Sequence, residues 1–244
     1  MSIPMNRRPL RLVRIVMLSV LSTFVVFGAT STAQAQSDQT ARVAPRGSTP
    51  YGMTYENWAA ALLRWVYSKP VAVSPLVDST GTLTQQAESG KVWFLLGPSE
   101  LVNQPQELSL TMPAGTALFF SPLGFYGAGP TPFCLTAADC LDFVKFLIFD
   151  LHVIAAQRVE IDGVPISAMD QYLIVSPIVP VNVPADNFWI DFLSVPGPFS
   201  FGVFGGFGLF IEPLPPGQHV IHAQTTGGGE PFEITYTITV TPGK

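Results

Sequence analysis

The last strand-like stretch of the chain, FEITYTITVT at 232–241, carries the strongest fold signal in the sequence. Its apolar and polar side chains alternate without a break, and the apolar set is Ile234, Tyr236, Ile238 and Val240. Because successive side chains of a β-strand point to opposite faces, such a segment has one buried face and one face in water. This pattern is typical of an antiparallel sheet with one solvated face, as in a β-sandwich.

The sequence before this stretch continues the β pattern. A Gly227–Gly229 turn follows a strand at 219–224, and a proline-rich turn at 213–217 separates that strand from 209–211. These strands are expected to form an antiparallel meander with 232–241. Further short strands, divided by glycine and proline, are predicted at 91–96, 107–111, 116–121, 158–161, 164–166, 172–175 and 179–183. We therefore expect a mainly β protein with a single β-sandwich-like domain, immunoglobulin-like or jelly-roll-like.

A helix is predicted before the strands. Thr54 is a suitable N-cap for a helix that reaches about Ser68. Trp58 and Trp65 are seven residues apart and share one apolar face, which favours packing against the strands.

A second helix is predicted in mid-chain, from Ala137 to about Gln157. Thr136 and Asp139 have the spacing of a capping box at its start, with Asp in place of Glu. Apolar residues, Phe146 among them, cover so much of its circumference that we expect packing on two sides.

The first 35 residues have the composition of an export signal. Four arginines precede an apolar run at 15–29, which is short for a membrane span, and Ala33-Gln34-Ala35 matches a cleavage site of small residues. We expect a signal peptide at 1–35 cleaved after Ala35, a flexible tether at 36–50 and one domain at 51–244; an uncleaved anchor is the alternative. The protein would be exported to the periplasm or the exterior, with no transmembrane segment in the mature chain.

Charge and composition exclude several classes of protein. Only 12% of the residues are charged, about half the usual quarter, and the high apolar content argues against disorder. Removal of the leader, which holds four arginines and no acid, changes the formal charge from −5 to −9. Such a chain lacks the basic face that nucleic-acid binding needs. With three histidines and two cysteines we expect no metal site and no cofactor.

Five short motifs occur in order along the mature chain: Tyr51-Gly52-x-Thr54-Tyr55-x-x-Trp58, Val92-Trp93-Phe94-Leu95-x-Gly97, Pro113-Ala114-Gly115-x-Ala117-Leu118-Phe119-Phe120, Asp162-Gly163 and Pro213-Leu214-Pro215-Pro216-Gly217-x-His219. Together they resemble a family of secreted bacterial proteins of uncharacterised function. The resemblance implies export to a compartment that permits disulfides, and it implies no activity. A Trp-Trp pair of the family is replaced here by Leu62-Leu63, and its two cysteines near the positions of Thr84 and Leu110 are both missing.

Cys134 and Cys140 enclose five residues in a loop rich in glycine and proline. Behind an export signal, a structural disulfide is the expected state of this pair. The alternative is a redox-active pair, although such pairs favour two intervening residues.

His219 and His222 are the weak catalytic candidates. Positions three apart on a strand point to opposite faces, so the two rings are not expected to bind one metal ion. Either histidine could act alone with a nearby carboxylate, but the sequence contains no G-x-S-x-G nucleophile motif.

The stretch 188–210 combines phenylalanine and glycine to an unusual degree. Three explanations stay open: a buried hairpin between sheets, an oligomer interface, or an apolar ligand surface. The side chains proposed for an interface or ligand surface are Phe199, Phe201, Phe204, Phe207 and Trp189.

The leading interpretation is an exported, non-catalytic binding or interaction protein of the cell envelope or exterior. Its partner would be a second copy of the chain, an apolar ligand or a glycan, and not a nucleic acid. The alternative is a secreted hydrolase of unusual type that uses His219 with a nearby carboxylate.

Overall fold

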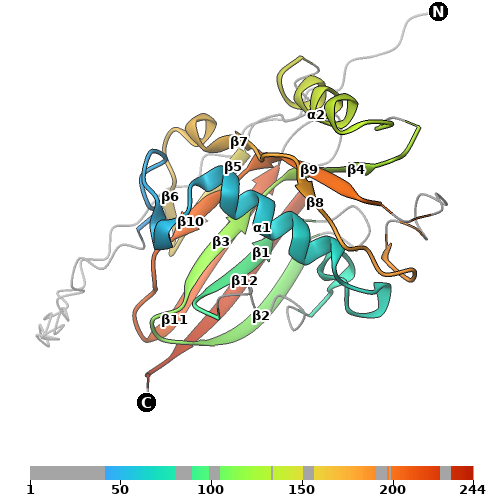
Figure 1. Ribbon diagram of the computed structural model, residues 1–244. Helices are drawn as coiled ribbons and strands as arrows, with labels where there is room; N and C mark the ends of the chain where they lie inside the picture. The colour runs from blue at the N-terminus through green and yellow to red at the C-terminus, as the bar shows by residue number, and fades with distance from the viewer. Residues whose placement is uncertain are drawn as a thin grey trace, which may run out of the picture. The chain divides into compact units, whose positions relative to one another are not determined.

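The computed structural model shows a mainly β protein, as the sequence predicts (Figure 1). Its described residues contain twelve strands in three sheets and two α-helices, an arrangement consistent with a β-sandwich-like fold. They are 42–80, 90–98, 105–132, 134–150, 157–188, 190, 197, 199–225 and 232–243. The expected signal peptide and Trp189 lie outside them.

Two of the sheets form the sandwich. One contains β1 (Val92–Leu96), β3 (Ala117–Ser121) and β10 (Leu209–Ile211), in the order β1-β3-β10. The other has the order β2-β12-β11-β5-β6 and consists of β2 (Gln106–Pro113), β12 (Phe232–Thr241), β11 (Gly217–Thr225), β5 (Gln157–Ile161) and β6 (Val164–Pro165).

The alternation in β12 gives the strand one buried face, as predicted. Its apolar side chains are buried, whereas the residues between them are half-buried or exposed. Tyr236 reaches across to the three-stranded sheet, where its hydroxyl donates a hydrogen bond to the Leu96 carbonyl at 2.8 Å and its ring contacts Phe120. The inner faces of the two sheets therefore pack against each other.

The predicted meander is confirmed for β11 and β12, which pair antiparallel, but not for β10. β10 pairs with β3 in the other sheet, and β12 has β2 as its second neighbour, in parallel. The turn at 213–217 thus carries the chain between sheets. Because Ile211 and the other two residues of β10 are all buried, this strand is covered on both faces and fits the central layer better than an outer wall.

Helix α1 (Tyr55–Tyr67) covers the outer face of the three-stranded sheet (Figure 1). Thr54 caps it as predicted, because its hydroxyl accepts a hydrogen bond from the Asn57 backbone N–H at 3.3 Å. The rings of Trp58 and Trp65 both contact Phe94 of β1. The core therefore has three layers: α1, the three-stranded sheet and the five-stranded sheet.

The third sheet continues two strands of the central layer. It has the order β4-β9-β7 and consists of β4 (Gly124–Gly129), β9 (Phe201–Phe207) and β7 (Leu173–Val175), with β8 (Val179–Pro180) also paired to β9. Since β3 pairs with β10 and β4 with β9, the two chain segments form one long antiparallel pair with a bend at 122–123 and Gly208. Helix α2 (Ala137–Lys145) and a π-helical turn (Phe146–Asp150) follow β4.

Residues 42–50, the part of the expected tether that the structure describes, are attached to the domain. Val43 pairs with Ile211, and the Ala44 backbone N–H donates to the Phe210 carbonyl at 2.8 Å. The Tyr55 hydroxyl also donates to the Ala44 carbonyl. The segment thus adds to the edge of β10 at Val43 and Ala44. This attachment was not predicted, because the segment as a whole is polar.

Candidate functional site

The Phe/Gly stretch forms a strand, β9, that is packed on both faces. Phe204 is completely buried, Phe199 and Phe207 are nearly so, and Phe201 is half-buried. The burial agrees with the first of the three explanations, but β9 and β10 do not form a hairpin between sheets, because β9 pairs with β4 and β10 with β3. The rings of Phe199, Phe204 and Phe207 are not available on the surface for a ligand or an oligomer contact.

The glycines of β9 explain how two helices approach the same strand. A β-carbon at Gly202 would lie 3.2 Å from Leu63 of α1, whereas one at Gly205 would lie 2.4 Å from Val144 of α2. Positions three apart on a strand face opposite sides, so α1 and α2 pack on opposite faces of this sheet. Glycine is required because both helices come within the space of a side chain.

His219 does not have the setting of a general base. Its Nδ1 lies 2.7 Å from Oδ2 of Asp162, as the hydrolase alternative would require. However, its Nε2 lies 2.9 Å from the Pro215 carbonyl oxygen, which can only accept a hydrogen bond. Nε2 must therefore donate its proton there and has no lone pair for a substrate or a water molecule. The residue is 8% exposed.

His222 lies on the opposite, solvated face of β11, as the spacing predicts. Its Nε2 is 2.5 Å from Oε1 of Glu233 on the neighbouring strand, with 28% of the His222 side chain exposed. A surface pair of this kind links two strands and lacks a nucleophile. The described residues also contain no group of three or more His, Cys, Asp or Glu side chains that could hold a metal ion.

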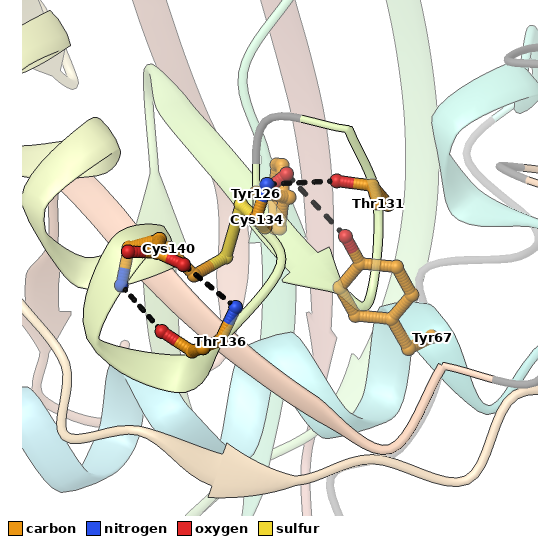
Figure 2. The surroundings of a disulfide bond; sticks show 7 residues. Tyr67, Tyr126, Thr131, Cys134, Thr136 and Cys140 are labelled. Carbon is orange, nitrogen blue, oxygen red and sulfur yellow. Dashed lines mark hydrogen bonds between the residues drawn. A yellow bond between two sulfur atoms is a disulfide. The ribbon is translucent and has the colours of Figure 1, made fainter.

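Cys134 and Cys140 are joined in a disulfide, as expected (Figure 2). The bond ties the loop after β4 to the first turn of α2. The predicted capping box is present within the same ring: the Asp139 N–H donates to the Thr136 hydroxyl at 3.2 Å, and the Thr136 N–H donates to Asp139 Oδ2 at 2.9 Å. Both cysteines are buried, which fits a structural role.

An apolar cavity lies beside this disulfide and is the candidate binding site. Its volume is about 290 Å³, and it is bounded by β4, α2, the end of α1 and the loop that carries Thr131. The lining residues that the structure describes are Tyr67, Gly124, Phe125, Tyr126, Gly127, Ala128, Thr131, Cys134, Phe143, Val144, Leu147 and Phe199. None of these twelve is charged at neutral pH.

The two tyrosines keep the cavity electrically neutral. Burial raises the pKa of both Tyr67 and Tyr126 above the ordinary value of a phenol, so both stay protonated. The Tyr67 hydroxyl points toward β4 and donates to the Tyr126 carbonyl at 3.3 Å (Figure 2). Thr131 supplies a second hydroxyl, whose oxygen accepts the Cys134 N–H at 3.1 Å.

Exposed apolar side chains lie on the π-helical turn after α2 and just before the N-cap of α2. Phe146 and Phe149 of the turn are 45% and 49% exposed, and Leu135, which precedes Thr136, is 67% exposed. In the described part of the predicted helix, Val144 and Ile148 are buried against the sheet with Leu141 and Phe143 packed beside them. Phe146 and Phe149 are exposed, so the predicted packing on two sides is not seen in these residues.

One indirect signal for the cavity was present in the sequence, whereas its lining residues could not be identified there. The apolar excess of the second helix was visible, but Phe143 and Leu147 could not be assigned to a cavity wall. Gly124 and Gly127 of β4 allow Phe204 and Val144 to approach the strand closely, and where the cavity opens beside them depends on how β4 faces α2.

Comparisons with known proteins do not assign a family. No protein-family model and no curated protein matches the chain. A solved structure titled "Structure of PbICP-C in complex with falcipain-2" matches with a TM-score of 0.25 and 12% identity, over 62% of this chain and 100% of that one. A likeness at this level does not bear on fold or function. In the part of the chain that the structure describes, no helix has the length and hydropathy of a membrane span.

Proposed function

We propose that the protein is an exported, non-catalytic binding protein of the cell envelope or exterior. The leader at 1–35, the resemblance to secreted bacterial proteins and the closed disulfide between Cys134 and Cys140 all support export. The bound molecule is small and apolar, and it occupies the cavity between β4 and α2.

The observation that carries this proposal is the cavity itself. Small-molecule sites are concave, mostly apolar and equipped with few polar groups. The cavity matches this description, with Phe125, Phe143 and Leu147 on its walls and the hydroxyls of Tyr67 and Thr131 as its side-chain polar groups. Binding would be driven by removal of apolar surface from water, at about 25 cal/mol per Å² before ordering costs.

The hydrolase alternative has less support. His219 and Asp162 form a close pair, but the second ring nitrogen of His219 is engaged by the Pro215 carbonyl. A general base must reach the proton that it abstracts, and this ring would first have to break its hydrogen bond to Pro215.

A fluorescent apolar probe tests binding at the cavity. N-phenyl-1-naphthylamine should bind the purified protein, and Leu147→Trp, which places a larger ring on the cavity wall, should weaken binding at least about tenfold, or about 1.4 kcal/mol. Phe149→Trp is the matched control, because Phe149 is on the same helical turn but does not line the cavity. Equal probe affinity in both variants would refute the cavity as the site.

Intact-mass measurement tests export. Protein recovered after secretion should lack residues 1–35 and should gain two hydrogens on reduction, because its two cysteines are bonded. Retention of the leader, or two free thiols in the secreted protein, would contradict this part of the proposal.

A further inference from the structure

We infer that the ligand of the β4–α2 cavity is an uncharged, planar aromatic molecule of about two fused six-membered rings. This inference rests on the proposed function and adds the chemical class of the ligand. It follows from the charge, the ring content and the volume of the cavity.

The described part of the lining selects against ions. None of its twelve residues is an acid, a lysine, an arginine or a histidine, and the raised pKa of Tyr67 and Tyr126 keeps their phenols neutral. A carboxylate or an ammonium group that entered would lose its water without meeting a countercharge, which costs several kcal/mol. The ligand therefore carries no charge on the part that enters.

The lining favours an aromatic ligand over an aliphatic one. Five of the twelve lining residues have rings, namely Tyr67, Phe125, Tyr126, Phe143 and Phe199. Aromatic rings attract one another in offset or edge-to-face geometry beyond the effect of buried area. A flat ring system could adopt this geometry against the rings of the lining, whereas an alkyl chain could not.

The volume sets the size of the ligand. A cavity of about 150 Å³ lined by apolar side chains holds one benzene molecule. The cavity here is about 290 Å³, nearly twice as large, and so admits two fused rings.

One polar substituent can be accommodated at Thr131. The Thr131 oxygen accepts the Cys134 N–H, and its own hydroxyl proton can be donated to a ligand oxygen. A hydroxylated bicyclic aromatic therefore fits the polar and apolar parts of the wall together.

Titration calorimetry with four probes tests the inference. The probes are 1-naphthol, decahydro-1-naphthol with the same skeleton but no π system, 1-naphthoate with a charge, and 1-decanol as a linear chain. We expect 1-naphthol to bind at least about tenfold more tightly than each of the others. Naphthalene, which has no hydroxyl, is a separate reference compound for the variants. Thr131→Val should weaken binding of 1-naphthol but not of naphthalene, whereas Leu147→Trp should weaken binding of both.

The outcomes separate this inference from the proposed function. If decanol or decahydronaphthol binds as tightly as naphthol, and Leu147→Trp still weakens it, the aromatic class is wrong while the cavity remains a binding site. If naphthoate binds as tightly as naphthol, the inference of an uncharged ligand is wrong. If the fluorescent probe and all four compounds bind equally to wild type and Leu147→Trp, or not at all, both proposals are wrong.

Discussion

The Nδ1 atom of His219 lies 2.7 Å from Oδ2 of Asp162, and this contact joins β11 to the turn between β5 and β6. Asp162 occupies that turn with a positive φ of 53°, and its other oxygen accepts the Val220 backbone N–H at 2.8 Å. His219 extends the connection to the Pro215 carbonyl. One buried imidazole therefore ties two turns and a strand together, a structural role that sequence alone could not distinguish from a catalytic one.

Replacement of His219 should lower stability. His219→Ala removes both hydrogen bonds and leaves the Pro215 carbonyl without its partner, so we expect a loss of about 1–3 kcal/mol in the free energy of unfolding. Urea unfolding followed by circular dichroism measures it. His222→Ala is the control, since the half-exposed pair of His222 and Glu233 is expected to contribute less than about 1 kcal/mol. Equal losses of stability in the two variants would contradict the role of His219 in joining the two turns to β11.

Asn187 should be a stability determinant at the end of α1. It is 1% exposed, and its Nδ2 donates to the Tyr67 carbonyl at 2.9 Å and the Lys69 carbonyl at 2.7 Å. Asn187→Ala leaves both carbonyls without this donor, and we expect a loss of about 1–3 kcal/mol by urea unfolding. The exposed Asn57→Ala on the same helix should change stability by less than about 0.5 kcal/mol. An Asn187→Ala protein as stable as wild type would show that water replaces the amide.

Gly205 should tolerate no β-carbon. In Gly205→Ala the new atom would lie 2.0 Å from Cδ1 of Ile148 and 2.4 Å from Cγ1 of Val144, so α2 must shift away from β9. Overpacking of this kind costs about 1–3 kcal/mol, and movement of α2 should also change probe affinity at the cavity. Gly47→Ala is the control, because nothing lies within 4 Å of its added carbon. If Gly205→Ala melts like Gly47→Ala, the close approach of α2 is wrong.

Local features of the fold were predictable because each is determined by neighbouring residues. Thr54 and the Thr136–Asp139 pair cap their helices through contacts three residues apart. Asp162-Gly163 turns the chain between β5 and β6 because both residues adopt a positive φ, which this dipeptide favours. The buried face of β12 was predictable as well, because it follows from the alternation of apolar and polar residues within the strand.

Features that depend on distant segments were not predictable from the pattern. The parallel pairing of β2 with β12 and the placement of β10 in the other sheet join residues far apart in sequence. The role of Gly205 depends on Val144, some sixty positions earlier, and nothing in the sequence near Gly205 indicates this partner. The cavity depends on the same packing, so the sequence showed an excess of phenylalanine but not where the rings would point.

Alkaline pH should unfold the protein through its buried tyrosines. Burial raises the pKa of Tyr55, Tyr67 and Tyr236 above the ordinary value of about 10. Below about pH 10 these phenols are protonated in both states, so they cause no pH dependence. Above it the unfolded chain releases protons that the folded chain retains, and stability falls by up to about 1.4 kcal/mol per pH unit for each tyrosine. Urea midpoints measured from about pH 8 to about pH 11.5 should therefore drop steeply beyond pH 10.

Single tyrosine variants identify which side chains cause this loss. Tyr67→Phe should reduce the slope above about pH 10 by the share of one group, about 1.4 kcal/mol per pH unit at most. Tyr51→Phe should not change it, because Tyr51 is 48% exposed. Tyrosinate absorbance should rise together with the loss of circular dichroism, since the buried phenols ionise only when the chain unfolds. Ionisation of all the tyrosines near pH 10 with the fold intact would contradict the burial of Tyr67 and, with it, the neutral wall of the cavity.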